Sequence, residues 1–190
     1  KELLDVHRIR EGSPLYQRFL REARITARLE HPGIVPVYEL GQAEDGSVYY
    51  TMKRVRGRTL KDTIEECGDL AGRMQLMAHY LDFCQAIGFA HSQQVIHRDL
   101  KPSNLFVSHE SQVKLGDFGI ARDMDEGDIT VAGLTVGTRS YMSPEQITGE
   151  VVSGKSDLYS LGCVLFELLV GKPPFQRSEE HTSELQSRTK

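Results

Sequence analysis

Apolar residues recur at helical spacing in three parts of the chain. Residues 14–30 and 73–92 carry them at intervals of three and four, which is typical of helices that bury one face. A denser apolar run, Leu158 to Val170, indicates a third helix. The sequence His31-Pro32-Gly33 ends the first helix and Gly171 ends the third, because Pro and Gly interrupt helical backbone. One face of the second helix is expected to hold Met77, Tyr80, Leu81, Cys84, Ile87 and His91.

Short runs rich in β-branched and aromatic residues predict two hairpins. The first joins the runs Ile34–Leu40 and Val48–Val55 through a polar turn that contains a glycine. The second joins Leu105–Val107 and Val113–Leu115. Val95-Ile96 is expected to form a short strand that leads into the polar loop after it.

The composition is that of a globular domain, with 39% hydrophobic and 26% charged residues. A formal net charge of −4 gives no electrostatic case for a nucleic-acid partner, which calls for a basic patch or stripe. The longest apolar run is interrupted by Ser160 and Glu167 and is too short to span a bilayer.

Cysteines and histidines show no metal-binding spacing. The cysteines are far apart, and because Cys84 and Cys163 lie in apolar helical runs, we interpret them as buried free thiols of a reducing compartment. His79 and His91 lack an accompanying cluster of Cys, His or carboxylate residues, so structural roles are favoured over metal binding. The three cysteines are Cys67, Cys84 and Cys163.

The polar loop His97–Asn104 is the most informative segment, and Asp117-Phe118-Gly119 begins thirteen residues after Asn104. Phosphoryl transfer needs a carboxylate to orient the hydroxyl, oxygen ligands for magnesium and cations near the migrating charge. A single Asp-Phe-Gly or His-Arg-Asp is usually an ordinary turn. Eight specified positions in this order and at this separation are not explained by chance.

H-R-D-L-x-x-x-N followed by D-F-G is the protein-kinase signature, and the chain resembles a bacterial, eukaryote-like (Hanks-type) Ser/Thr protein kinase. The resemblance implies an α+β, bilobal, protein-kinase-like fold. Residues 1–52 would form a partial N-lobe from its third strand and helix C onward, and 53–60 the hinge region. Residues 61–176 would form a partial, mainly helical C-lobe that ends after helix F. The implied cofactors are ATP and Mg²⁺, with Mn²⁺ as an alternative, and the substrates are Ser or Thr residues of proteins.

The resemblance assigns roles to residues of the catalytic loop and beyond. Asp99 is expected to accept the proton of the substrate hydroxyl, and Lys101 to neutralise the γ-phosphate. Asn104 and Asp117 are expected to hold the metal ions. Asp157 resembles the helix F aspartate that anchors the backbone of the catalytic loop.

Two neighbouring positions of the loop have other implied roles. His97 is expected to pack and hydrogen-bond near the Phe118 turn, which is a structural role. Arg98 is expected to receive a phosphate of the activation segment, with a simple surface arginine as the alternative.

The resemblance also implies nucleotide contacts. Lys1 resembles the lysine of the V-A-I-K strand, and Glu22, twenty-one residues later, resembles its partner on helix C. The alternative for Lys1 is a solvated terminal lysine. The further nucleotide contacts implied are the gatekeeper Met52, the hinge backbone at Lys53 and Val55, and Leu105.

Asp117 to Glu145 resembles an activation segment, with Ser-Pro-Glu where the family usually has Ala-Pro-Glu. Lys101 together with Thr138 resembles the pattern of Ser/Thr-specific kinases. Thr130 and Thr135 are the expected phosphorylation sites, because an added phosphate can pair with a basic residue and order the segment. Plain loop threonines are the alternative.

Residues 177–187 match the in-frame translation of a common sequencing adaptor, so 177–190 is expected to be a non-native tail. A polar, solvated tail is the alternative. The resemblance implies a Gly-rich loop before Lys1 and further helices after helix F. The polypeptide of 190 residues is therefore expected to be weakly stable and weakly active.

Three interpretations of function compete. The first is an active ATP-dependent Ser/Thr kinase, and it is favoured for the parent domain because every catalytic-loop and D-F-G residue is present. The second is a noncatalytic, pseudokinase-type nucleotide-binding or scaffold module. The third is a small-molecule phosphotransferase, which is not expected to carry this activation segment. The first implies a cytoplasmic domain, a parent anchored at the inner face of the plasma membrane, and activation through a homodimer.

Overall fold

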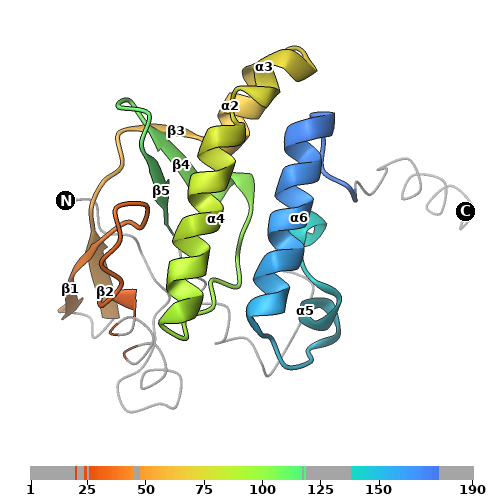
Figure 1. The fold of residues 1–190 in the computed structure, drawn as a ribbon. Helices are drawn as coiled ribbons and strands as arrows, with labels where there is room; N and C mark the ends of the chain where they lie inside the picture. Colours follow the sequence, from red (N-terminus) through yellow and green to blue (C-terminus); the bar gives the residue numbers. More distant parts are fainter. Residues whose placement is uncertain are drawn as a thin grey trace, which may run out of the picture.

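The computed structural model describes residues 20, 24, 26–44, 48–116, 118 and 138–175 (Figure 1). Within the first predicted helix, Leu20, Arg24 and Thr26 are helical, and the rest of that helix up to residue 25 lies outside the described residues. The backbone turns at residues 27–28, before His31-Pro32-Gly33.

The first predicted hairpin is confirmed. Strand β1, Val37–Gln42, pairs antiparallel with β2, Val48–Met52, and places Leu40 opposite Tyr50. The strands are shorter than predicted, because the chain leaves the extended pairing after Met52. Residues 53–56 then connect this two-stranded sheet to the next sheet.

The second sheet has the order β3-β4-β5, with β3 at Gly57–Thr59, β4 at Leu105–Ser108 and β5 at Val113–Leu115. The predicted β4–β5 hairpin is confirmed, whereas β3 was not predicted. A Cβ atom on Gly57 would lie 2.1 Å from the Val107 carbonyl oxygen, so β3 approaches β4 too closely for any other residue.

Five α-helices are described, and caps explain several of their ends. Thr59 and Asp62 form a capping box at the start of α2, and Ser153 and Ser156 form another at the start of α6. Gly171 ends α6 in the left-handed conformation, with φ of 83°, as the sequence predicted. The helices are α2 Leu60–Glu66, α3 Leu70–Met74, α4 Met77–Ser92, α5 Pro144–Thr148 and α6 Gly154–Val170.

Helix α4 lies between the three-stranded sheet and α6 (Figure 1). The Tyr80 hydroxyl donates to the Leu161 carbonyl at 3.2 Å, which ties α4 to α6. The predicted buried face is partly wrong: Leu81 is 55% exposed, and the face that packs is centred on Phe83. A helix packed on two sides buries a wider stripe than one apolar row indicates. The buried residues of α4 are Tyr80, Phe83, Ala86, Ile87 and Ala90.

The predicted strand at Val95-Ile96 is wrong, because these residues have no regular secondary structure. The Val95 amide instead donates to the Ala90 carbonyl at 2.9 Å and closes the end of α4. In the part of the chain that the structure describes, no helix is long and apolar enough to cross a membrane.

Candidate active site

One buried carboxylate of α6 anchors the predicted catalytic loop, His97–Asn104. Asp157, in the first turn of α6, is 1% exposed and accepts the backbone N–H groups of His97 at 2.8 Å and Arg98 at 2.9 Å. The His91 ring donates to the same carboxylate from α4, at 2.7 Å. The predicted anchoring contact of Asp157 is confirmed, and the His91 contact confirms a structural role for that residue.

The His97 side chain is fully buried and joins the loop to the turn that holds Phe118. Its Nε2 donates to the Gly116 carbonyl at 2.9 Å, and its ring centroid lies 4.6 Å from that of Phe118. The Asp99 amide donates to Nδ1 at 3.3 Å, so one ring nitrogen donates and the other accepts. The predicted structural role of His97 is therefore confirmed.

Arg98 adopts a backbone conformation that is rare for a residue with a side chain. Its φ is 67°, and its carbonyl accepts the Gln146 side-chain amide at 2.7 Å. Ser143 and Gln146 form a capping box that fixes Gln146 at the start of α5. The capping-box sequence Ser143-x-x-Gln146 was the signal for this support, and our sequence analysis missed it. Such local strain persists only where surrounding contacts enforce it.

The three predicted catalytic residues of this loop lie together. The Lys101 ammonium is 3.1 Å from Asp99 Oδ2, and both side chains are mostly covered. The Asn104 amide nitrogen donates to the Asp99 carbonyl at 2.8 Å and to Asp99 Oδ2 at 3.1 Å. A 3₁₀ turn, Pro102–Asn104, brings Asn104 back toward Asp99. The arrangement offers a positioned carboxylate with a cation beside it.

The donor chemistry of this region suits magnesium. Both hydrogen bonds from Asn104 to Asp99 use the amide nitrogen, which leaves the amide oxygen as the group that a hard cation prefers. Asp117, the predicted second ligand, lies outside the described residues. Elsewhere in the described ranges, no group of three His, Cys, Asp or Glu residues could hold a metal ion.

The predicted nucleotide residues lie between the two sheets. Met52 ends β2, and the Lys53 amide donates to the Pro36 carbonyl at 3.0 Å. Val55 follows in the connecting segment, and Leu105 is fully buried at the start of β4. The structure therefore places Met52 at the end of β2, Lys53 and Val55 on the connection that follows it, and Leu105 in the adjacent sheet.

Several predicted residues lie outside the part that the structure describes. These include both members of the predicted Lys–Glu pair, the D-F-G aspartate and the two phosphorylation candidates. Thr138 begins a 3₁₀ helix, Thr138–Tyr141, that leads to α5. The sites outside the described residues are Lys1, Glu22, Asp117, Thr130, Thr135 and the tail 177–190.

The segment that follows Thr138 docks on α6. The Ser160 hydroxyl donates to the Tyr141 carbonyl at 2.7 Å, and the Tyr141 hydroxyl donates to the Glu167 carboxylate. Burial raises the pKa of Glu167. Burial, together with the neighbouring Glu167 carboxylate, also raises the pKa of Tyr141. The Ser156 hydroxyl donates to Glu145 and holds the pKa of that carboxyl below its usual value. These contacts fix the backbone that carries Gln146.

Comparisons with known proteins agree with this geometry. A family model described as "Protein kinase domain" matches residues 3–190. "Serine/threonine-protein kinase PknB" of Mycolicibacterium smegmatis is 47% identical over 167 residues, which cover 84% of this chain and 26% of that protein. "Probable serine/threonine-protein kinase PknB" of Bifidobacterium longum is 43% identical over 170 residues, with 83% and 24% covered. The chain spans about a quarter of the length of these curated relatives.

Solved structures show the same similarity. The crystal structure of the Mycobacterium tuberculosis PknI kinase domain superimposes with a TM-score of 0.71 at 27% sequence identity. The match covers 93% of this chain and 65% of that one. The kinase-like α+β fold expected from the sequence is thereby confirmed.

Proposed function

Since this chain belongs to the protein kinase domain family, as a bacterial Hanks-type Ser/Thr kinase domain, we propose that it transfers the γ-phosphoryl group of ATP to protein hydroxyls. The observation that best supports this proposal is the cluster of Asp99, Lys101 and Asn104. These side chains contact one another on a loop that Asp157 anchors through two backbone amides.

In the proposed mechanism, Asp99 orients the Ser or Thr hydroxyl of the substrate and accepts its proton. Lys101, whose ammonium lies beside that carboxylate, offsets the negative charge of the transferred group. The contact with Asn104 holds the Asp99 carboxylate in one orientation, so the reacting hydroxyl meets a preorganised base.

The nucleotide and its metal would lie between this loop and the hinge. Asn104 and Asp117 would hold Mg²⁺, or Mn²⁺ in its place, which neutralises charge on the phosphates when it is bound. The Lys53 amide is already used by Pro36, so the Lys53 carbonyl and the Val55 backbone are the groups proposed for adenine. The other residues proposed to contact ATP are Lys1, Glu22, Met52 and Leu105.

Regulation is proposed to act through the activation segment. Phosphates on Thr130 or Thr135 would carry strong acceptors that can pair with Arg98. Thr138, at the start of the 3₁₀ helix, would take part in recognising the substrate hydroxyl together with Lys101. Residues 1–52 are proposed to form part of the N-lobe, residues 53–60 the hinge region, and residues 61–176 part of the C-lobe.

The proposed partners are proteins with accessible Ser or Thr residues. The proposed location of the domain is the cytoplasm, where ATP is available and where Cys67, Cys84 and Cys163 would stay reduced, as they are here. A membrane anchor in the parent protein and activation through a homodimer are further proposals from the family resemblance.

A matched pair of carboxylate substitutions tests the proposed activity. Asp99→Asn removes the base but keeps the size of the side chain, whereas Asp82→Asn makes the same change on the exposed face of α4. Both variants and the unsubstituted chain are incubated with labelled ATP, Mg²⁺ and a mixed library of Ser, Thr and Tyr peptides. Binding of a fluorescent ATP analogue is measured in parallel.

We expect Asp99→Asn to lose at least about 100-fold in transfer rate, because general-base catalysis is worth 10²–10⁴-fold. Nucleotide binding should stay within about two-fold, and Asp82→Asn should match the parent protein. If the unsubstituted chain binds the nucleotide but transfers no phosphoryl group, the noncatalytic module is favoured. Equal rates for Asp99→Asn and the parent protein would refute the proposed role of Asp99.

A further inference from the structure

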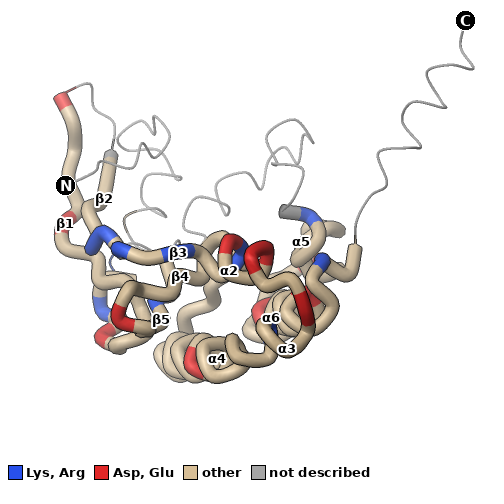
Figure 2. The backbone as a smooth tube through the Cα atoms, turned by 90° about the horizontal axis from the view of Figure 1, so that it is seen from above, with Lys and Arg blue, Asp and Glu red and all other residues tan. Residues whose placement is uncertain are grey.

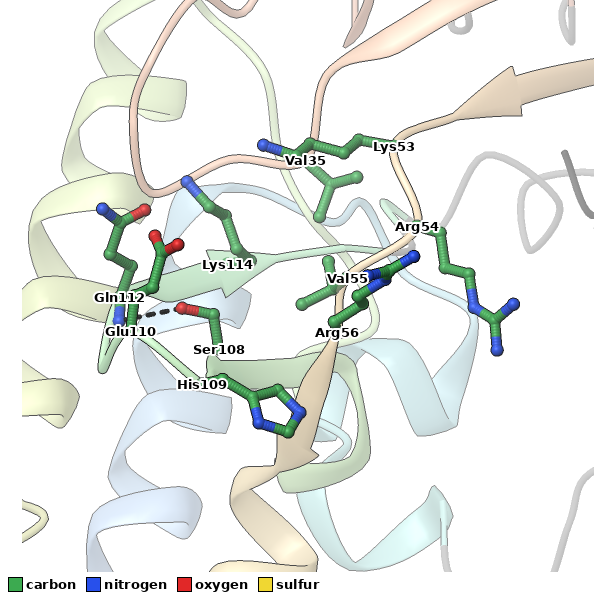
Figure 3. Close-up of a pocket in the computed structure, with 10 residues that line it drawn as sticks. All are labelled: Val35, Lys53, Arg54, Val55, Arg56, Ser108, His109, Glu110, Gln112 and Lys114. Atoms are coloured by element: carbon green, nitrogen blue, oxygen red, sulfur yellow. Dashed lines mark hydrogen bonds between the residues drawn. The ribbon is translucent and has the colours of Figure 1, made fainter.

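A cavity lies beside residues 53–56, the segment that joins β2 to β3 (Figure 3). Its volume is about 540 Å³, and the turn between β4 and β5 forms its other wall. None of the residues His97–Asn104 lines it, so the cavity is distinct from the cluster at Asp99, although Lys53 and Val55, whose backbone is proposed for adenine, also line it. Its lining residues come from three segments, 35, 53–56 and 108–114.

The charge of this cavity is opposite to that of the whole chain. The chain carries a formal net charge of −4, yet Lys53, Arg54, Arg56 and Lys114 all line the cavity. Glu110 is the one carboxylate among the ten described lining residues. Figure 2 shows the same contrast: basic positions gather from β2 to β3, while α2 carries several acidic ones. A concave surface of one sign concentrates ligands of the other sign.

The two lysines face the same space. In Figure 3 the Lys53 and Lys114 side chains extend toward one side of Val35, whereas Arg54 points away from them. The Lys114 ammonium donates to the Pro32 carbonyl, which holds it in place. Burial lowers the pKa of Lys114, and the positive charge of Lys53 lowers it further. An anion between the two ammonium groups would relieve this repulsion.

The frame around the cavity is held by backbone hydrogen bonds. The Lys53 amide donates to the Pro36 carbonyl at 3.0 Å, and the His109 amide donates to the Arg56 carbonyl at 3.2 Å. The Val35 amide donates to the Leu115 carbonyl at 2.9 Å. Because these contacts fix the backbone of the segments that carry the basic side chains, little backbone ordering is needed when a ligand binds.

We propose that this cavity binds an acidic peptide segment of a partner protein. The cationic side chains would pair with Asp or Glu carboxylates, and the half-buried Val55 offers apolar surface beside them. The volume falls in the range of pockets that hold a drug-sized ligand, about 300–1,000 Å³, so the cavity would hold part of an extended peptide. Charge complementarity of this kind gives selectivity for acidic sequences and speeds association. The proposal does not depend on catalysis, because none of these side chains acts in the transfer step.

The test measures binding of fluorescent nine-residue peptides to the full chain by anisotropy. One peptide alternates Asp or Glu with apolar residues, a second has Gln in place of each acid, and a third has Lys. Arg56→Gln/Lys114→Gln removes two charges from the cavity. Its matched control, Lys155→Gln/Lys172→Gln, removes two exposed charges, one at the start of α6 and one two residues after its end. Thermal melts of each variant establish that it is folded.

We expect only the acidic peptide to bind, and its affinity to fall at least about ten-fold between about 50 and about 300 mM NaCl. The cavity variant should bind at least about ten-fold more weakly, because it lacks two of the four cationic groups that would pair with the peptide. The control variant should stay within about two-fold. Glu110→Gln, which removes the opposing carboxylate, should bind more tightly than the parent chain, and this readout remains decisive where the double variant does not fold.

Three results would overturn the proposal. The first is equal binding of the acidic and Gln peptides. The second is an equal loss of affinity in the cavity and control variants, which would assign the binding to net charge alone. The third is displacement of the peptide by inorganic phosphate at low millimolar concentration, which would assign the cavity to small anions.

Discussion

Replacing Asp157 by Ala removes the carboxylate that holds the catalytic loop on α6. Asp157 is 1% exposed, and it accepts two backbone N–H groups and the His91 ring. With Ala at this position, the buried amide of His97 and the partly buried amide of Arg98 would lose their hydrogen-bond acceptor. We therefore expect both a loss of stability and a displaced loop.

The size of the effect follows from the hydrogen bonds. A bond to a charged acceptor contributes about 1.5–3 kcal/mol, so losing the two backbone bonds should cost about 4 kcal/mol. That is a large share of the 5–15 kcal/mol that typically stabilises a domain. Asp157→Asn keeps one acceptor oxygen and should cost about half as much. Because a loop displacement of about 1 Å can cost about 100-fold in rate, phosphoryl transfer should fall in both variants.

Urea unfolding followed by circular dichroism measures the free energy of unfolding, and Asp82→Ala on the exposed face of α4 is the matched control. The control should change stability by less than about 0.5 kcal/mol. If Asp157→Ala destabilises the protein no more than Asp82→Ala does, the anchoring argument is wrong.

Three further predictions concern packing, pH and a helix end. Gly57→Ala should lower the free energy of unfolding by about 1–3 kcal/mol, because the new Cβ would lie 2.1 Å from a β4 carbonyl oxygen. The control Gly162→Ala, with nothing within 4 Å of its Cβ, should not lower it. Equal urea midpoints for the two variants would refute the predicted clash. Burial raises the pKa of Glu167 above 4.5, so the folded state binds this proton more tightly than the unfolded state. Stability should therefore fall relative to Glu167→Gln as pH rises from 4.5 through the raised pKa, and parallel melting curves across pH would contradict it. Arg73→Met should lower the free energy of unfolding by about 1 kcal/mol, because the guanidinium donates to carbonyls in the last turn of α6 at 3.1 and 3.3 Å. An unchanged melting temperature would contradict a stabilising role for this contact.

Local signals in the sequence predicted much of the fold. The two hairpins, the Gly171 end of α6 and the roles of Asp157 and His97 each depend on a motif or a turn residue. The strand β3 was missed because three residues give too short a pattern, and its partner β4 lies far along the chain. Leu81 was misplaced because apolar spacing alone does not say which neighbours cover a helix.

The candidate site, like the fold, was predicted only in part from the sequence. The motif spacing located Asp99, Lys101 and Asn104, and the structure shows that they contact one another. The support from Gln146 and the basic cavity beside residues 53–56 could not be read directly from spacing, because each joins segments that only the fold brings together. Basic residues at 53, 54 and 56 were visible in the sequence, but Lys114 comes from a distant strand.

The most direct test of the central claim compares three peptides that differ at one position, with Ser, Thr or Ala there and no other hydroxyl. The measured quantity is the initial rate of phosphate incorporation from ATP and Mg²⁺, for the parent protein and for Asp99→Asn. We expect incorporation into the Ser and Thr peptides only, and its loss by at least about 100-fold in Asp99→Asn. Phosphate on none of the peptides, or equal rates with and without the Asp99 carboxylate, would contradict the claim that this loop is a Ser/Thr kinase active site.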